Sequence, residues 1–133
     1  MSDLFELLGI PCVPVTNGSE AGVARLSRMG EGDVVLAIGF RRAHSITIAF
    51  AERALEQGVQ VVIVTDNSLS ELAGKGSVTL YADIDSTFFA HSVVGAVGLV
   101  GALSAAVYNG DRELYDARVR SIRDKGTESG WLR

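Results

Sequence analysis

The segment between residues 39 and 47 reads Gly-Phe-Arg-Arg-Ala-His-Ser-Ile-Thr and combines cationic with hydroxyl side chains. Arg41 or Arg42 could supply positive charge for a phosphate, and the hydroxyls of Ser45 and Thr47 could donate hydrogen bonds to it. If a helix begins here, its first backbone N–H groups would add further donors. The alternative interpretation is that Ser45 caps the helix and both arginines are solvated. The residues alone favour neither interpretation, so this segment is a candidate anion site.

Two further segments carry polar side chains at the same kind of position. Asp66, within residues 65–68, could accept hydrogen bonds from sugar hydroxyls. Asp, Asn and Ser are also ordinary turn and capping residues, and that structural interpretation is favoured here. Residues 83–87 are interpreted in the same way, because Asp85 or Ser86 could cap the helix that follows.

Groups suited to catalysis are few. His44 could act as an acid or base, but no carboxylate stands at a motif spacing from it, and an exposed loop histidine is favoured. His91 lies in an apolar stretch and is expected to be a hydrogen-bonded core or interface residue. The chain has no metal-ligand spacing, no nucleophile elbow, no GxGxxG and no P-loop. The sequence therefore predicts no catalytic residue, no metal and no cofactor.

Unbroken apolar runs alternate along the chain with helical patterns. Such runs are typical of strands buried on both faces of a parallel sheet. The expected strands cover residues 11–15, 33–39, 59–64 and 78–82, and the expected helices cover 19–29, 45–57, 88–108 and 111–125. This order predicts an α/β fold, a doubly wound parallel sheet that binds ligands beyond the carboxyl ends of its strands. The three polar segments all lie at such ends.

The N-terminal part is expected to lack the opening unit of this fold. Residues 1–9 read as the end of a helix, whereas a doubly wound sheet usually opens with a strand and a glycine-rich loop. The expectation is one partial domain over residues 1–133, lacking the first strand and its loop. Its core is expected at about residues 4–123, with a flexible tail at 126–133.

Composition limits the function classes. Hydrophobic residues make up 47% and charged residues 21%, as in a globular protein, and the net charge of -4 argues against a nucleic-acid footprint. The single cysteine, Cys12, is expected to be a buried, inert thiol, and no signal segment opens the chain. Residues 88–108 carry no charge, but their polar and small residues favour a buried helix over a membrane span. A cytoplasmic protein is expected.

Three segments resemble a known family. Residues 32–41, residues 58–73 and residues 86–89 look like the sugar isomerase (SIS) domain of RpiR-type transcriptional regulators, and the likeness runs from about residue 4 to about residue 123. The resemblance implies a flavodoxin-like fold that binds phosphosugars, usually dimerises, and follows a DNA-binding helix-turn-helix. That helix-turn-helix is not in this chain, so DNA would be contacted only through a segment absent here.

The resemblance carries over to individual residues in part. Thr47 matches the threonine that closes the family's phosphate loop, and Arg41 matches an arginine frequent in the regulator branch. Gly39 stands where a serine is common, and His44 and Ser45 have no assigned role in the pattern. Together with Asp66, these residues form the candidate ligand site.

Three functions are consistent with the sequence. The first is a phosphosugar sensor that modulates a DNA-binding segment and forms a homodimer. The second is a phosphosugar isomerase, for which only His44, Asp66 or Glu52 could be the general base. The third is a dimerisation module without a ligand, which would pair through residues 88–108.

Overall fold

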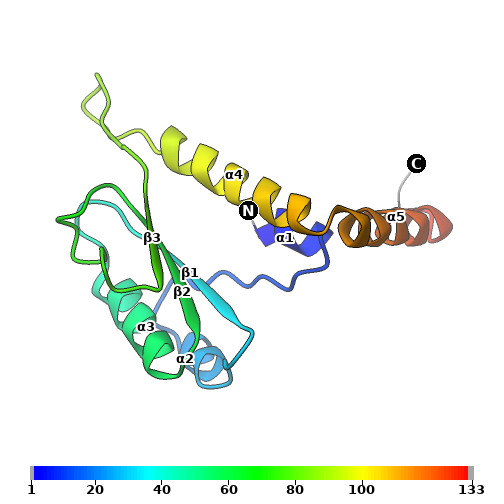
Figure 1. Ribbon diagram of the computed structural model, residues 1–133, viewed down its shortest axis with the longest axis horizontal. Coiled ribbons are helices and arrows are strands. Elements are labelled where there is room, and N and C mark those ends of the chain that lie inside the picture. Colours follow the sequence, from blue (N-terminus) through cyan, green and yellow to red (C-terminus); the bar gives the residue numbers. More distant parts are fainter. Residues whose placement is uncertain (1, 132–133) are drawn as a thin grey trace. The chain divides into compact units, whose positions relative to one another are not determined.

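The computed structural model describes residues 2–131, which divide into two compact units. One unit covers residues 15–97, and the other combines the two ends of the chain, up to residue 14 and from residue 98. The elements, labelled in Figure 1, are α1 (Ser2–Leu7), α2 (Glu20–Leu26), β1 (Val34–Ile38), α3 (Ser45–Glu56), β2 (Gln60–Thr65), β3 (Val78–Tyr81), α4 (Val94–Gly110) and α5 (Arg112–Glu128).

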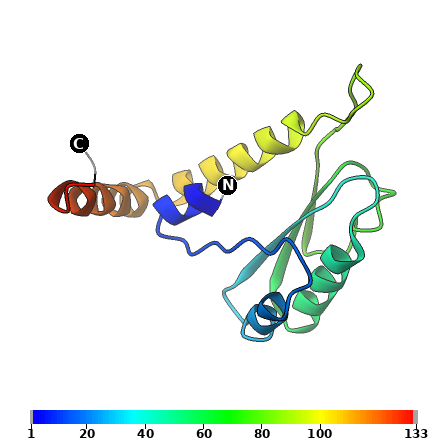
Figure 2. The ribbon, with the colours of Figure 1, turned by 180° about the vertical axis from the view of Figure 1, so that it is seen from behind.

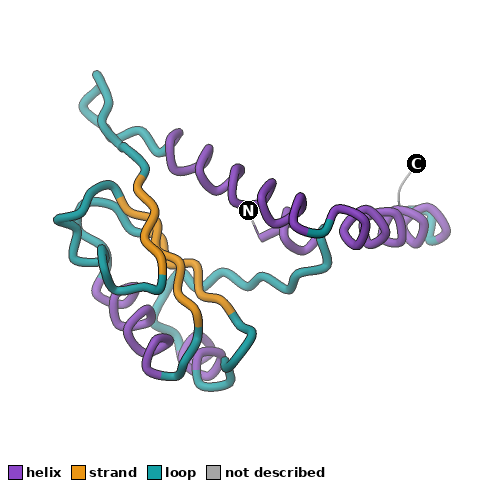
Figure 3. Tube along the Cα trace, in the orientation of Figure 1, coloured by secondary structure: helices purple, strands orange, loops and turns teal. Residues whose placement is uncertain are grey.

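The unit of residues 15–97 is built on a three-stranded parallel sheet in the order β1-β2-β3, drawn in orange in Figure 3. Leu36 of β1 pairs with Val62 of β2, and Val64 of β2 pairs with Leu80 of β3. The central strand β2 is nearly all β-branched, as its sequence Gln-Val-Val-Ile-Val-Thr shows, and such residues pack well on a pleated surface. The expected strands at 33–39, 59–64 and 78–82 are confirmed.

Helix α3 covers one face of β1 and β2, and α2 packs against α3 (Figure 2). Helix α3 approaches the sheet closely because it presents the small side chains of Ala51 and Ala54, both fully buried, to β1 and β2. Val61 and Ile63 of β2 meet them and are also fully buried, and Leu72 completes the cluster. This core fixes the start of α3 relative to the ends of β1 and β2, where the predicted site lies.

The expected strand at residues 11–15 is wrong: the segment is irregular and mostly exposed. A strand needs a neighbouring strand for its hydrogen bonds, and no strand within residues 2–131 pairs with it. Pro11 and Pro14 also lack the N–H donors that a ladder requires. The described residues therefore hold three strands where the sequence predicted four.

The helix expected from residue 88 begins at Val94 instead. Side-chain hydroxyls stop it from starting earlier: Ser86 Oγ accepts the N–H of Phe88 at 3.1 Å, and Ser92 Oγ accepts the N–H of Val94 at 3.4 Å. The N–H of Ser92 also turns back to the carbonyl of Ile84 at 3.0 Å. Neither Asp85 nor Ser86 caps α4.

In the other unit, α1 and the long helix α5 lie against each other. Nη1 of Arg118 donates to the carbonyl oxygen of Leu8 at 3.2 Å and so closes the end of α1. Helix α5 continues through Gly126 to Glu128, past its expected end, and residues 132–133 of the expected tail lie outside the described residues. Within the described part of the chain, no helix has both the length and the hydropathy to cross a membrane.

Candidate functional site

An open hollow of about 830 Å³ lies beyond the carboxyl ends of β1 and β2. This is where ligands bind in doubly wound sheets, because the loops that follow parallel strands meet there. The lining comes from all three loops that the sequence singled out: Phe40, Arg41, Arg42, Asp66, Asn67 and Asp85. Two of the predicted residues, Arg41 and Asp66, are therefore brought together.

The loop after β1 is tied to the end of β2 by its backbone. The N–H of Arg41 donates to Oδ1 of Asp66 at 2.9 Å. Arg41 has a φ of 53°, the left-handed conformation that costs a residue other than glycine roughly 1–2 kcal/mol. The bond to Asp66 helps to hold this turn and leaves the guanidinium of Arg41 at the hollow.

The carboxylate of Asp66 is held in its ionised form. Partial burial raises its pKa, but hydrogen bonds from the backbone N–H groups of Arg41 and Asp66 and from the side chains of Thr65 and Asn67 outweigh burial, so the pKa lies below its ordinary value. The side-chain donors are Thr65 Oγ1, at 3.2 Å from Oδ1, and Asn67 Nδ2, at 2.9 Å from Oδ2. A carboxylate of this kind accepts hydrogen bonds well and removes protons poorly.

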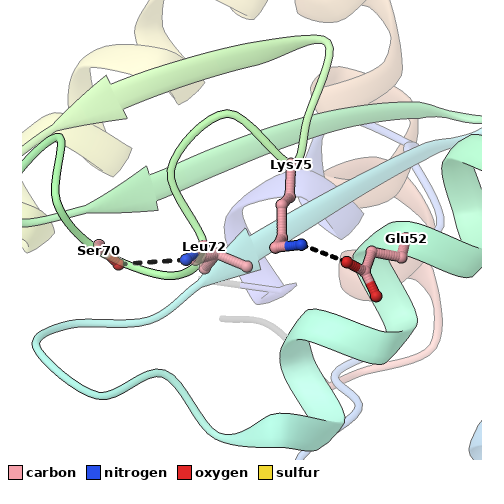
Figure 4. Close-up of polar contacts among 4 residues, drawn as sticks. All are labelled: Glu52, Ser70, Leu72 and Lys75. Atoms are coloured by element: carbon pink, nitrogen blue, oxygen red, sulfur yellow. Dashed lines mark hydrogen bonds and ion pairs between the residues drawn. The ribbon is translucent and has the colours of Figure 1, made fainter.

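The loop after β2 is fixed by buried hydroxyls. Oγ1 of Thr65, which is fully buried, is hydrogen-bonded to Oγ of Ser70 at 2.8 Å, and Ser70 Oγ accepts the N–H of Leu72 at 3.3 Å. Figure 4 shows this second bond and the ion pair between Lys75 and Glu52, which joins the end of the loop to α3. The loop that carries Asp66 is thus anchored at both ends.

Gly39 has a packing role at the start of the loop after β1. Its N–H donates to the carbonyl of Val64 at 3.0 Å. A Cβ at this position would lie 2.9 Å from Cβ of Ala43 and 3.2 Å from Cδ2 of Leu72. No side chain fits there without a shift of its neighbours, which explains the glycine where the resemblance leads one to expect serine.

The other predicted residues lie around the first turn of α3 and do not line the hollow. His44 is the N-cap, exposed and extended in backbone, and its side chain makes no capping hydrogen bond. Ser45 is the first helical residue, so the alternative in which Ser45 is the cap is wrong. The N–H of Thr47 turns back to the carbonyl of His44 at 2.8 Å.

Four lining residues are outside the site predicted from the sequence, although Arg42 was considered there as the alternative to Arg41. Arg42, Asn67 and Asp85 lie in the three loops that the sequence did point to, so loop position was the available signal. Asp85 sits in a turn closed by its own N–H, which donates to Oδ1 of Asp83 at 2.8 Å. Phe40 is apolar, and nothing in its type or spacing indicated a site.

The lining combines two guanidinium groups with two carboxylates and an amide. Guanidinium groups bind phosphate or carboxylate oxygens, whereas carboxylates and amides accept hydrogen bonds from hydroxyls. The hollow is therefore suited to a ligand with an anionic end and a hydroxylated body. Residues 2–131 hold no cluster of histidine, cysteine or acidic side chains that could bind a metal ion.

Solved structures share this fold. The sugar isomerase domain of an RpiR transcription factor from Sphaerobacter thermophilus matches with a TM-score of 0.84 and 24% identity, over 92% of this chain and 69% of that one. The Vibrio vulnificus NanR protein complexed with ManNAc-6P matches with a TM-score of 0.76 and 21% identity, over 96% of this chain. A hypothetical protein matches at 0.60 and 17% identity, over 88% of this chain and 67% of that one. The chain spans about half of NanR, 49% of its length.

No curated protein matches this chain. The likeness to the solved structures confirms the predicted flavodoxin-like α/β fold. The family model that matches is the SIS domain, over residues 2–106, which is most of the chain. This chain belongs to the SIS domain family.

Proposed function

We propose that this chain is the phosphosugar-binding sensor domain of an RpiR-type transcriptional regulator, whose DNA-binding segment lies outside it. The observation that carries the proposal is the hollow at the strand ends, where Arg41 and Arg42 face the same space as Asp66 and Asp85. The complex of the similarly folded NanR with ManNAc-6P supports a sugar phosphate as the ligand. The lone cysteine fits the reducing cytoplasm.

Each group has a defined role in this proposal. Arg41 and Arg42 bind the phosphate, and Asp66 and Asp85 accept hydrogen bonds from the sugar hydroxyls. The site extends from Gly39, whose close packing sets the path of the loop, to the first turn of α3. The side chains of His44, Ser45 and Thr47 lie around that turn, outside the lining of the hollow, and are proposed as secondary contacts to the ligand. A helix N-terminus adds a favourable field for the anion.

Calorimetry with a panel of sugar phosphates tests the proposal. ManNAc-6P, glucose 6-phosphate and fructose 6-phosphate are compared with the free sugars and with inorganic phosphate. We expect saturable binding that Arg41→Ala weakens roughly tenfold to a hundredfold, the range for a lost hydrogen bond to a charged group. Thr47→Ala should weaken it less.

Arg123→Ala is the matched control, because Arg123 is an exposed arginine on α5, outside the hollow. It should leave the affinity unchanged. A folded protein that binds none of the sugar phosphates would refute the proposal, as would equal losses in Arg41→Ala and Arg123→Ala.

The geometry of the site gives little support to the alternative in which this chain is an isomerase. Of its three candidate bases, only Asp66 lines the hollow, and the lowered pKa of its carboxyl makes it a weak base. Glu52 is paired with Lys75. Turnover of ketose and aldose phosphates by the purified chain, lost in Asp66→Asn, would reinstate the isomerase and overturn the sensor.

A further inference from the structure

The two carboxylates that line the hollow differ in how far the chain itself already engages them. Oδ1 of Asp66 accepts hydrogen bonds from the N–H of Arg41 and from Oγ1 of Thr65. Oδ2 of the same residue accepts another from Nδ2 of Asn67. The carboxylate of Asp85, in contrast, is exposed and makes no hydrogen bond and no ion pair within the described part of the chain. Asp85 is therefore the carboxylate with both oxygens free for a ligand.

Opposite charges face the same hollow without pairing with each other. Arg41, Arg42 and Asp85 all line it, yet the described residues contain no ion pair between Asp85 and either arginine. The guanidinium groups attract an anionic ligand, whereas the exposed carboxylate is charged at neutral pH and repels the same anion. A volume of about 830 Å³ leaves room for a small molecule between the two charges. A ligand with a cationic group at the end near Asp85 would be attracted at both ends.

The loop after β3 holds Asp85 in place. The N–H of Asp85 donates to Oδ1 of Asp83 at 2.8 Å. Ala82 and Ile84 are buried on either side of that turn. The carbonyl oxygen of Ile84 accepts the N–H of Ser92 at 3.0 Å. Because the backbone is already ordered, less conformational entropy is lost when Asp85 binds a ligand, so its charge can contribute to specificity.

We infer that the ligand is a sugar phosphate that also carries a protonated amine, with the phosphate at Arg41 and Arg42 and the ammonium group at Asp85. The inference rests on the proposed function and narrows its ligand to a class that is anionic at one end and cationic at the other. An ammonium group donates three hydrogen bonds and pairs with the carboxylate charge, whereas a hydroxyl donates one and an acetamide brings no charge. The hydroxyls of the sugar are left to Asp66 and Asn67.

Calorimetry of the whole chain with three hexose 6-phosphates tests this ligand class. Glucosamine 6-phosphate, glucose 6-phosphate and N-acetylglucosamine 6-phosphate differ only in the group at C2, which is an ammonium, a hydroxyl or an acetamide. We expect glucosamine 6-phosphate to bind about tenfold tighter than the other two, because a charge-assisted hydrogen bond is stronger than a neutral one. Free glucosamine, which has no phosphate for the arginines, should bind more weakly than glucosamine 6-phosphate.

Asp85→Asn removes the charge and keeps the shape of the side chain. In this variant the affinities for glucosamine 6-phosphate and glucose 6-phosphate should converge. Urea unfolding of the same sample checks that the variant is folded. Asp124→Asn is the matched control, since Asp124 is an exposed aspartate on α5, outside the hollow, and this variant should keep the difference between the two ligands.

The outcomes separate this inference from the proposed function. If none of the sugar phosphates binds, the proposed function fails and the inference fails with it. If they bind but glucosamine 6-phosphate has no advantage, the sensor proposal stands and the amine is overturned. A preference for glucosamine 6-phosphate that persists in folded Asp85→Asn also overturns the inference, because another group must then recognise the amine.

Discussion

The backbone N–H of Arg41 donates to Oδ1 of Asp66 at 2.9 Å, and this bond links the loop after β1 to the end of β2. One carboxylate thereby organises two of the loops that surround the hollow. Its side-chain donors, Thr65 and Asn67, are the residues next to it in the chain. The relationship makes Asp66 a structural residue as well as a proposed ligand contact, and the two roles respond differently to substitution.

Replacing Asp66 by alanine should destabilise the fold. The change leaves the N–H of Arg41 and Nδ2 of Asn67 without their acceptor, whereas Thr65 Oγ1 keeps its hydrogen bond with Ser70 Oγ. Because these groups are partly open to water, we expect a loss of about 1–2 kcal/mol in the free energy of unfolding, measured in urea. Asp85→Ala is the control, because Asp85 lines the same hollow. This substitution should change the free energy of unfolding by no more than about 0.5 kcal/mol. Equal losses in both variants would contradict this account.

Asp66 should also make stability depend on acid pH. Its pKa in the folded chain lies below the ordinary value of 3.8, which describes the unfolded chain. The stabilising contribution is therefore complete above pH 3.8 and is lost as the pH falls through the folded pKa, because the unfolded chain takes up the proton first. Urea unfolding between neutral and acid pH should show a flatter profile for Asp66→Asn. Parallel profiles would mean that other carboxylates dominate.

Arg41 allows binding and backbone strain to be separated. Arg41→Gly removes the guanidinium and relieves the left-handed backbone, a gain of roughly 1–2 kcal/mol that the flexibility of glycine in the unfolded chain reduces by about half. Arg41→Ala removes the guanidinium and keeps the strain. Both variants should lose sugar-phosphate affinity, and only Arg41→Gly should unfold at higher temperature. Lower stability in Arg41→Gly than in Arg41→Ala would refute the claim that this turn is strained.

Two glycines of α4 should respond to alanine in opposite ways. A Cβ on Gly101 meets nothing within 4 Å, so Gly101→Ala should stabilise the helix by about 0.5–1 kcal/mol. A Cβ on Gly95 would lie 2.9 Å from the carbonyl oxygen of Asp83, so Gly95→Ala should destabilise the fold by roughly 1–3 kcal/mol. Thermal unfolding of the two variants measures the contrast. A loss in Gly101→Ala would indicate that this face of α4 is covered in solution.

The sequence correctly predicted those strands whose own residues favour a buried strand. The apolar runs at 33–39 and 59–64 became β1 and β2, because unbroken β-branched runs have few alternatives to a buried strand. The run at 11–15 is also apolar, but it contains two prolines and has no neighbouring strand within residues 2–131. Pairing between strands is not visible in a local pattern. The start of α4 depended on the hydroxyl of Ser92, which a hydropathy pattern does not register.

The site was predicted to the level of loops. Sheet topology placed Arg41 near Asp66, because the ends of adjacent parallel strands meet. The left-handed turn at Arg41 and its bond to Asp66 depend on tertiary structure and leave no signature in residue type. Gly39 looked like part of a phosphate loop, whereas its contacts with Ala43 and Leu72 show a packing constraint that joins residues distant in sequence.

The close packing of Gly39 against Ala43 determines the order in which substitutions at these two positions can occur during evolution. A serine at position 39 must displace Cβ of Ala43, 2.9 Å from where its own Cβ would sit. Ala43→Gly would remove that obstacle first, whereas the same two substitutions in reverse order pass through an overpacked intermediate. The two positions are therefore epistatic, and lineages that carry serine at 39 should carry a smaller residue or a displaced backbone at 43.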